Sequence, residues 1–166
     1  PLDISVGEEV LISPGYSDLR RIGKHIAVIG TGGSGKSTFF KHIFLDIIKN
    51  QKGIPLYIEL RNINDSDLGL LQSIIAKLQT FDSDLTEGMI SNVIELGNFI
   101  FILDGLDELQ KEKRIQVAKE INELCEKFPT NTLIVSSRDI EACQTWQGFH
   151  VCYAKPLTLE KACLLI

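Results

Sequence analysis

One stretch of nine residues constrains this chain more than any other. It reads Gly-Thr-Gly-Gly-Ser-Gly-Lys-Ser-Thr, begins at Gly30 and fits the pattern G-x-x-x-x-G-K-[ST]. The apolar run His25–Ile29 predicts a buried strand before it, and the residues from Phe39 onward predict a helix after it. A strand, a glycine-rich loop and a helix in this order are what a phosphate-binding loop requires.

The chemistry of such a loop comes mainly from its backbone. Glycines let the chain curl so that successive N–H groups converge on an anion, and the start of the helix adds the positive end of its dipole. The Lys36 ammonium can reach the β- and γ-phosphates, and the Ser37 hydroxyl can ligate a bridging Mg²⁺. We therefore expect a nucleotide to be bound by Gly30, Thr31, Gly32, Gly33, Ser34, Gly35, Lys36, Ser37 and Thr38.

A second informative stretch is the apolar run that ends at Asp104. An unbroken hydrophobic strand that delivers an aspartate at its carboxyl end is the Walker B pattern, and this carboxylate is expected to hold Mg²⁺ through water. Asp107 and Glu108 follow on the loop, where one of them can polarise an attacking water. Glu108 is the favoured base and Asp107 a magnesium or water partner, but the sequence does not decide between them.

Polar residues follow two further predicted strands. The strand that begins at Thr132 runs into Arg138, whose guanidinium could sense the γ-phosphate or could pair with Asp139 or Glu141. Arg61 follows the strand that begins at Ile54, and a structural ion pair is favoured there over a nucleotide-sensing role.

The remaining segments are expected to support this core. Val6–Ile12 is either a short strand or a covering segment, and Trp146 is expected to pack in a loop rather than to stack on a base. The periodicity predicts three helices that cover the sheet, over Asp65–Gln79, Leu85–Leu96 and Glu112–Phe128. It also predicts a final strand over Phe149–Tyr153 and a further helix from Thr158 onward.

Composition narrows the classes of function. The chain has 166 residues, enough for one domain, and its net charge of −5 argues against general binding to nucleic acid or to an anionic membrane. The four cysteines are too widely spaced for a zinc site, and we expect free thiols in a reducing cytoplasm. Because the chain starts at Pro1 and stops inside a helical pattern, we interpret it as a piece of a longer protein.

Several classes of phosphate-loop protein do not fit. A GTPase would carry D-x-x-G at the second motif and a later N-K-x-D, and neither is found here. Five stretches together resemble a NACHT domain: the phosphate loop, the predicted strand from Pro55 to Arg61, the D-G-L-D-E run at Asp104, the S-S-R run that ends at Arg138 and the K-P-L-T run at Lys155. This family belongs to the STAND signal-transduction NTPases, which are related to AAA+ proteins.

The resemblance implies more than the residues alone. It implies a three-layer α/β/α P-loop NTPase with a five-stranded parallel sheet in the order 5-1-4-3-2, and ATP or ADP with Mg²⁺ as ligands. Pro156 would pack on the base. Members of the family hydrolyse slowly and use the nucleotide state as a switch for homo-oligomerisation, with effector, winged-helix and sensing domains as partners, often in innate immunity or defence against phage.

The expected domains are a lead-in segment over 1–22, a NACHT core over 23–155 and the start of a helical subdomain over 156–166. Three functions stay open: a slow ATPase switch, a motor ATPase of the AAA+ kind, and a scaffold that binds nucleotide without hydrolysing it. The intact set of Lys36, Ser37, Asp104 and Glu108 argues against the scaffold, and the spacing of the acidic run argues against the motor.

Overall fold

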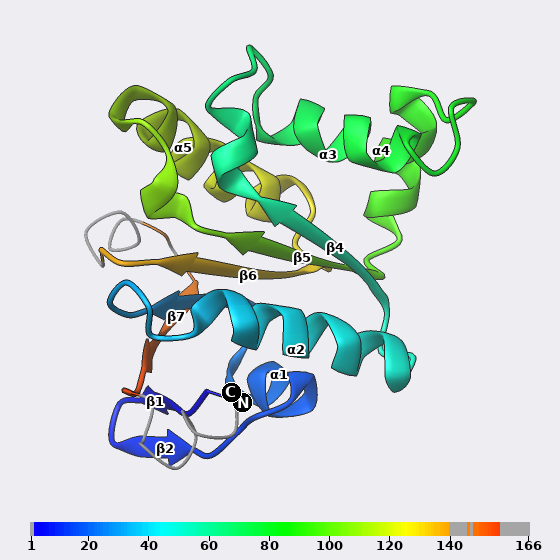
Figure 1. The fold of residues 1–166 in the computed structure, drawn as a ribbon. Helices are drawn as coiled ribbons and strands as arrows, with labels where there is room; N and C mark the ends of the chain where they lie inside the picture. Colours follow the sequence, from blue (N-terminus) through cyan, green and yellow to red (C-terminus); the bar gives the residue numbers. More distant parts are fainter. Residues whose placement is uncertain (1, 140–145, 147, 157–166) are drawn as a thin grey trace.

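A computed structural model describes residues 2–139, 146 and 148–156 of the chain. It is a mixed sheet of seven strands that lies between two layers of helices (Figure 1). The strands are β1 (Ile4–Val6), β2 (Glu9–Leu11), β3 (His25–Ile29), β4 (Ile54–Glu59), β5 (Phe99–Asp104), β6 (Thr132–Ser137) and β7 (Phe149–Ala154). The helices are α1 (Tyr16–Ile22), α2 (Lys36–Lys49), α3 (Leu70–Gln79), α4 (Glu87–Glu95) and α5 (Lys111–Lys127), with short 3₁₀ turns at η1 (Leu60–Ile63) and η2 (Leu106–Glu108).

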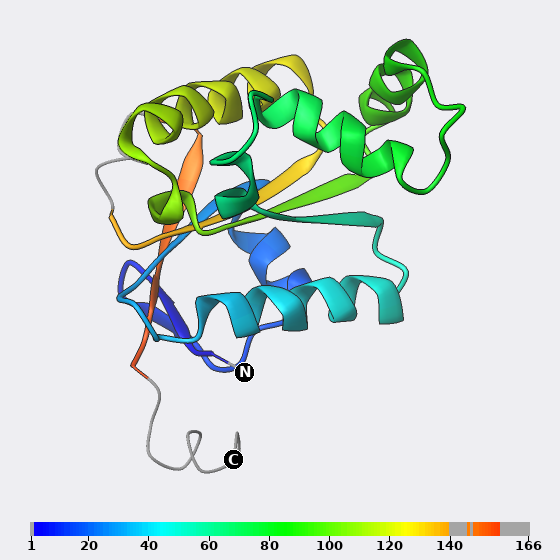
Figure 2. The ribbon, with the colours of Figure 1, turned by 45° about the horizontal axis from the view of Figure 1, so that its top comes forward.

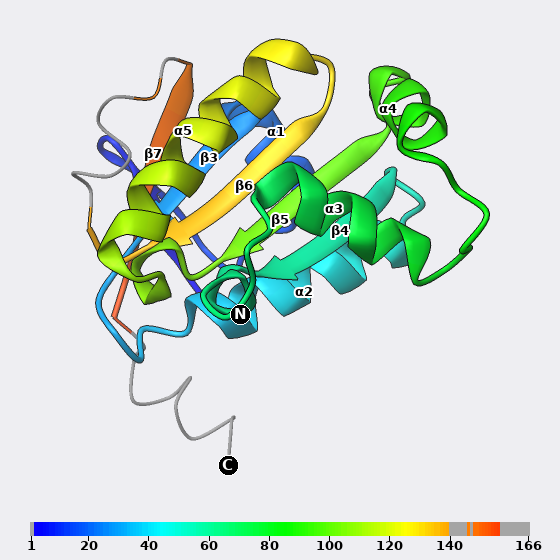
Figure 3. The ribbon, with the colours of Figure 1, turned by 90° about the horizontal axis from the view of Figure 1, so that it is seen from above.

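The order of strands across the sheet is β2-β1-β7-β3-β6-β5-β4. The five strands from β7 to β4 are parallel, and, numbered among themselves along the chain, they lie in the order 5-1-4-3-2. Seen from above, β6, β5 and β4 point toward the same edge of the sheet (Figure 3). Residues that follow these strands are therefore gathered at that edge.

Alternation along the strands builds two separate cores. On β3, the side chains of Ile26 and Val28 face α1 and α2, whereas Ala27 and Ile29 face the layer of α3, α4 and α5. This alternation with a period of two is what a sheet with helices on both faces requires. The same alternation determines which of the two helix layers each polar residue at a strand end faces.

The expectation of a five-stranded, wholly parallel sheet is wrong, because the first residues add an antiparallel hairpin. In β1, Ile4 and Ser5 pair with Ala154 and Tyr153 of β7, so the edge of β7 is covered (Figure 2). The hairpin turns at Gly7, which has a positive φ of 58°. Helix α1 after it was not expected either; its first N–H donates to the carboxylate of Asp46 on α2, at 2.8 Å.

Helix α3 begins five residues later than the periodicity predicts. The sequence expectation started it at Asp65, but the first helical residue is Leu70, whose N–H donates to the Glu120 carboxylate of α5. This carboxylate comes from a distant part of the chain, so it satisfies an N–H group at the helix start that local sequence would leave unpaired. Residues from Thr158 onward lie outside the described part of the structure.

The structure places Trp146 and two of the four cysteines as the sequence analysis expected. Trp146 is buried, donates its indole N–H to the Ala118 carbonyl at 3.0 Å and packs on the Phe149 ring at 4.7 Å between centroids. Cys125 and Cys152 are buried free thiols, and burial raises the pKa of each to about 12. None of the described helices combines the length and the apolarity that a membrane span needs.

Strand β4 is one edge of the sheet, and a proline lies near its beginning. The Ile54 N–H donates to the Asn98 carbonyl at 2.9 Å, so in a parallel pair the backbone of the next residue, Pro55, faces away from β5. Pro55 has no N–H group, and this outward position is one that a strand proline can occupy without losing a ladder hydrogen bond.

Asn131 joins the ends of three elements of the larger core. Its carboxamide oxygen accepts from the Phe99 N–H at 3.0 Å, and its amide donates to the Ile94 carbonyl at 2.9 Å. The side chain is only 3% exposed, so these backbone groups have no easy access to water.

We expect Asn131→Ala to lower the free energy of unfolding by about 2 to 3 kcal/mol, because it leaves buried backbone groups unpaired. Chemical denaturation measures this change. The control is Asn122→Ala, which removes a surface hydrogen bond to Glu126 and should stay within about 0.5 kcal/mol. Equal losses in the two variants would contradict the role given to Asn131.

Candidate functional site

The glycine-rich loop connects β3 to α2, as the motif predicts. Gly35 lies at the N-cap of α2 with a φ of 93°, a backbone conformation that costs glycine little and other residues considerably more. The first hydrogen bond within the helix runs from the Phe39 N–H to the Gly35 carbonyl, at 2.9 Å. The N–H groups of residues 36–38 therefore have no acceptor within the helix and form the anion-binding end of α2.

Lys36 is held against the loop that precedes it. Its ammonium donates to the carbonyls of Gly30 at 2.6 Å and Thr31 at 3.0 Å. Burial lowers the pKa of Lys36, the carboxylate of Asp107 opposes this shift, and the nearby Arg138 guanidinium adds to it. A phosphate oxygen at this position would favour the charged form of the lysine, because it would supply negative charge in a partly buried place.

Both oxygens of the Asp104 carboxylate accept hydrogen bonds. The Ser136 hydroxyl donates to one oxygen at 2.6 Å, and the Tyr57 hydroxyl donates to the other at 2.7 Å. These side chains come from β5, β6 and β4, three neighbouring strands, and Asp104 is 8% exposed. Burial, and secondly the hydrogen bond to Asp104, raise the pKa of Tyr57 above its usual range, so its hydroxyl remains a donor.

Asp107 and Arg138 form an ion pair that bridges the ends of β5 and β6. The carboxylate accepts from the Arg138 backbone N–H at 2.9 Å and from the guanidinium Nε at 2.9 Å. The guanidinium also lies against the phosphate loop, because a Cβ added to Gly32 would be 3.2 Å from its Cζ atom. The alternative of an ion pair between Arg138 and Asp139 is not seen, because Asp139 pairs with Arg114 at 3.5 Å. The other partner considered, Glu141, lies outside the described residues.

The residue next to Asp107 has a different environment. The Glu108 side chain is exposed and folds back over Gly105, where an added Cβ would be 3.0 Å from its carboxyl carbon. The loop that carries it is fastened by Asn64, which follows η1. The Asn64 amide donates to the Glu108 carbonyl at 3.0 Å, and its oxygen accepts from the Gln110 N–H at 2.9 Å.

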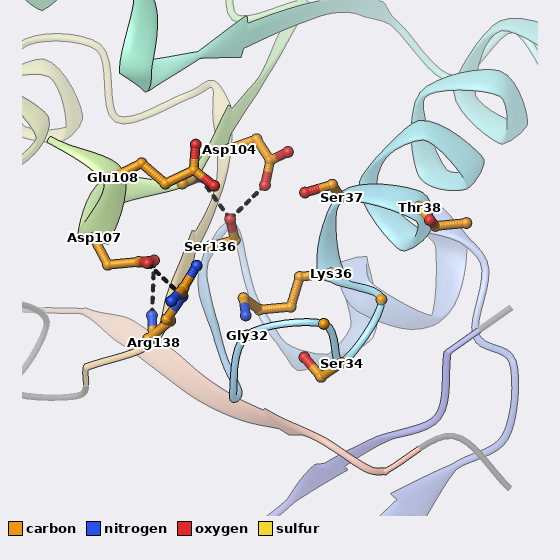
Figure 4. A pocket seen from close by; sticks show the side chains of 13 residues that line it. Gly32, Ser34, Lys36, Ser37, Thr38, Asp104, Asp107, Glu108, Ser136 and Arg138 are labelled. Atoms are coloured by element: carbon orange, nitrogen blue, oxygen red, sulfur yellow. Dashed lines mark hydrogen bonds and ion pairs between the residues drawn. The ribbon is translucent and has the colours of Figure 1, made fainter. Parts of the chain in front are cut away.

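These groups line one cleft of about 280 Å³. Figure 4 shows the acidic side chains of Asp104, Asp107 and Glu108 across the cleft from the glycine loop, with the Ser37 hydroxyl turned toward Asp104. The lining residues are Gly32, Gly33, Ser34, Gly35, Lys36, Ser37, Thr38, Asp104, Gly105, Asp107, Glu108, Ser136 and Arg138.

The donor set of this cleft fits a nucleotide with Mg²⁺. A hydroxyl and a carboxylate that face each other supply the oxygen ligands that Mg²⁺ prefers, and backbone N–H groups with Lys36 suit phosphate oxygens. The described residues hold no group of three or more His, Cys, Asp or Glu side chains that could bind a metal by itself.

Some predicted site residues lie outside the lining of the cleft. Gly30 and Thr31 contribute through the carbonyls that hold Lys36, whereas Pro156 is exposed after β7. Arg61 forms an ion pair with Glu59 at 2.9 Å, which confirms the structural interpretation.

Three contacting residues were not identified from the sequence: Ser136, Tyr57 and Asn64. A signal existed for Ser136, which begins the S-S-R run at the end of a mostly apolar strand, although only Arg138 in that run was given a role. Tyr57 stands in a strand pattern where a tyrosine reads as packing. Asn64 acts from a turn that is far from its partners in the sequence, and no local pattern indicates such a contact.

A nucleotide-sized cleft with a phosphate loop at one side and a strand-borne aspartate at the other defines a P-loop NTPase, a module that binds nucleotide. A profile of the NACHT domain matches residues 24–151. The chain therefore belongs to the NACHT family, whose P-loop NTPase domain is of the STAND class.

Solved structures agree on the fold. Cdc6p from Pyrobaculum aerophilum is similar with a TM-score of 0.57 at 16% identity, over 90% of this chain and 45% of that one. PCH-2 of C. elegans is similar with a TM-score of 0.52 at 14% identity, over 81% of this chain and 36% of that one. The chain thus spans less than half the length of either protein. A search of curated protein sequences gives no match.

We expect Asn64→Ala to reduce the turnover number for nucleotide about tenfold with little change in nucleotide affinity, because it frees the loop that carries Glu108 while the phosphate loop stays intact. Steady-state kinetics and a binding titration measure the two quantities. In the double variant Asn64→Ala/Glu108→Gln, the two losses of turnover should not multiply, since both substitutions act through the Glu108 carboxylate.

Asn50→Ala is the matched control, because Asn50 also makes two side-chain hydrogen bonds, to Asp46 at 3.0 and 2.7 Å, at the far end of α2. A tenfold loss of affinity in Asn64→Ala, or multiplied losses in the double variant, would show that Asn64 does not act through the Glu108 loop.

Proposed function

We propose that the chain is the ATP- and ADP-binding module of a signalling protein, that it hydrolyses ATP slowly with Mg²⁺, and that its nucleotide state controls a conformational change. The observation that carries this proposal is the bond between Arg138 and Asp107. It places a permanent cation beside the phosphate loop and ties it to the acidic loop after β5. Such an ion pair would couple the nucleotide bound in the cleft to the positions of the ends of β5 and β6.

Nucleotide binding falls to the loop and the start of α2. The N–H groups of residues 36–38 and the Lys36 ammonium converge on the place for the phosphates. Mg²⁺, when bound between Ser37 and Asp104, would neutralise charge on the phosphates. Adenine is preferred in this proposal because the guanine-recognition motif N-K-x-D is missing from the sequence. A role for Pro156 at the base is also proposed, from the family resemblance.

The contacts favour Glu108 over Asp107 as the general base. Both Asp107 oxygens are engaged by Arg138, and proton transfer from water would compete with that ion pair. Glu108 lines the cleft, is exposed and has a loop held by Asn64. We therefore give Glu108 the task of orienting and deprotonating the attacking water, and Asp107 the task of holding Arg138.

The proposed switch uses the ion pair between Asp107 and Arg138. A γ-phosphate near Lys36 offers Arg138 an alternative anionic partner, and the guanidinium can share or exchange Asp107 for it. Because the Arg138 backbone N–H also bonds Asp107, exchange of the guanidinium would change how the end of β6 is held. Differential contacts of this kind are what a ligand needs to shift a conformational equilibrium.

The setting of the whole protein is proposed from the NACHT family. We infer effector, winged-helix and sensing domains as partners within the parent chain, homo-oligomerisation on activation, and a cytoplasmic role in innate immunity or anti-phage defence. The free thiols of Cys125 and Cys152 support a reducing compartment. Direct contact with membrane or nucleic acid is not part of the proposal, given the net charge of −5.

Identification of the nucleotide that copurifies with the full-length protein tests this function. Tightly held ADP, released by denaturation and identified by mass spectrometry, together with slow ATP turnover, is the expected result. Fast turnover that rises with protein concentration would favour a motor instead. Nucleotide binding without any turnover would favour a scaffold, and absence of nucleotide binding would overturn the proposal.

We expect Lys36→Ala to weaken binding of ATP and ADP by about 100-fold or more, because charge-assisted hydrogen bonds to phosphates are lost. Calorimetry or a fluorescent nucleotide measures the affinity. Lys41→Ala removes an exposed lysine from the same helix and should bind as the wild type does. Wild-type affinity in Lys36→Ala would mean that the loop does not hold the phosphates.

We expect Glu108→Gln to reduce turnover of ATP by at least about 100-fold while affinity changes little, since the amide keeps the shape but cannot accept the proton. Single-turnover kinetics separate this effect from product release. Glu112→Gln, an exposed residue in the first turn of α5, is the control and should turn over normally. If Asp107→Asn stopped turnover and Glu108→Gln did not, the two roles would have to be exchanged.

A further inference from the structure

We propose that Tyr57 is a positioning residue for the metal: its hydroxyl, together with that of Ser136, fixes the Asp104 carboxylate in the orientation that supports Mg²⁺ in the cleft. This inference rests on the proposed function, since it needs a Mg²⁺-bound nucleotide. It assigns a role to an edge-strand tyrosine to which the sequence analysis gave no function.

The first step is the geometry of the carboxylate. One Asp104 oxygen accepts from Ser136 at 2.6 Å and the other accepts from Tyr57 at 2.7 Å, so neither oxygen can rotate away without breaking a hydrogen bond. Ser136 is completely buried, and its oxygen accepts from the Gly105 N–H at 2.8 Å. That bond directs the serine proton toward Asp104, so the direction of donation is set by the backbone.

The second step is the placement of Tyr57 itself. The core between the sheet and helices α1 and α2 contains Ile100 and Ile102 of β5 and Ile134 of β6. Because side chains alternate along a strand with a period of two, Asp104 and Ser136 lie on this same side of the sheet. Tyr57 packs against that core as well, and its ring meets the Phe44 ring of α2 edge-on at 6.3 Å between centroids. Tyr57 is thus fixed by ring packing while its hydroxyl reaches the carboxylate.

The third step is what the arrangement leaves available. A carboxylate has about four acceptor positions, so two hydrogen bonds leave one position on each oxygen for water ligands of a metal. The Ser37 hydroxyl is turned toward Asp104 from the start of α2 (Figure 4). Groups that hold a metal-binding carboxylate in place typically change metal affinity by about 10- to 100-fold when they are removed.

A purely structural role makes a different prediction. The hydrogen bond also joins β4 to β5, so its loss could simply destabilise the sheet. Such a loss would lower the stability of the protein and weaken nucleotide binding equally with and without metal. A positioning role changes only the part of the affinity that depends on Mg²⁺.

The experiment uses Tyr57→Phe in the full chain, which removes the hydroxyl and keeps the ring on Phe44. The affinity for ATP is measured with excess Mg²⁺ and again with EDTA, and thermal unfolding is recorded without nucleotide. Tyr16→Phe is the matched control, because the Tyr16 hydroxyl is also hydrogen-bonded to a side chain, the Thr132 hydroxyl at 3.2 Å. Unlike Asp104, the partner of Tyr57, Thr132 does not line the cleft.

The expected result is that Tyr57→Phe weakens binding of ATP about tenfold in Mg²⁺ and leaves binding in EDTA unchanged, whereas Tyr16→Phe changes neither. Equal weakening in both conditions, or no weakening in Mg²⁺, overturns the role of Tyr57 while the proposed function stands. A wild-type affinity that is the same in Mg²⁺ and EDTA overturns the metal role of Asp104 and, with it, this inference.

Discussion

The site depends on one constraint, the parallel pairing of β6 between β3 and β5. The Gly30 N–H donates to the Ser137 carbonyl at 3.1 Å, and Leu103 is in register with Val135, so three strand ends are fixed side by side. The phosphate loop, Asp104 and Arg138 follow these ends directly, although they are far apart in the sequence. Because a parallel sheet collects its carboxyl ends at one edge, the pairing alone assembles the cleft.

Four charged groups of the cleft, those of Lys36, Asp104, Asp107 and Arg138, are already partnered by the protein. Lys36 is held by loop carbonyls, Asp104 by two hydroxyls and Asp107 by Arg138. Poorly solvated charges without partners would cost several kcal/mol each, so these contacts let the site exist before a ligand enters. Glu108 is the most exposed of the three acids, which leaves it available for proton transfer.

The sequence predicted what local patterns encode. The glycine loop, the apolar strands and the acidic run each occupy consecutive residues, and their elements and relative places follow from general rules for parallel sheets. Contacts that join distant segments had no such signal. The hairpin on β7, the Glu120 carboxylate at the start of α3, and the bonds of Asn64 depend on which segments meet in space. Tyr57 was missed for the same reason, because its hydroxyl on β4 donates to a carboxylate on the neighbouring strand β5.

The proline at the start of β4 has a consequence for assembly. An open sheet edge offers unpaired N–H and C=O groups that can template another strand, and this is a common route to aggregation. The backbone of Pro55 faces this open side and offers no donor there, so a chain that tried to extend the sheet at β4 would meet a gap in the ladder. Among the described residues, this edge is therefore protected by the N–H group that proline lacks rather than by a covering segment, and a strand from another chain would pair poorly here.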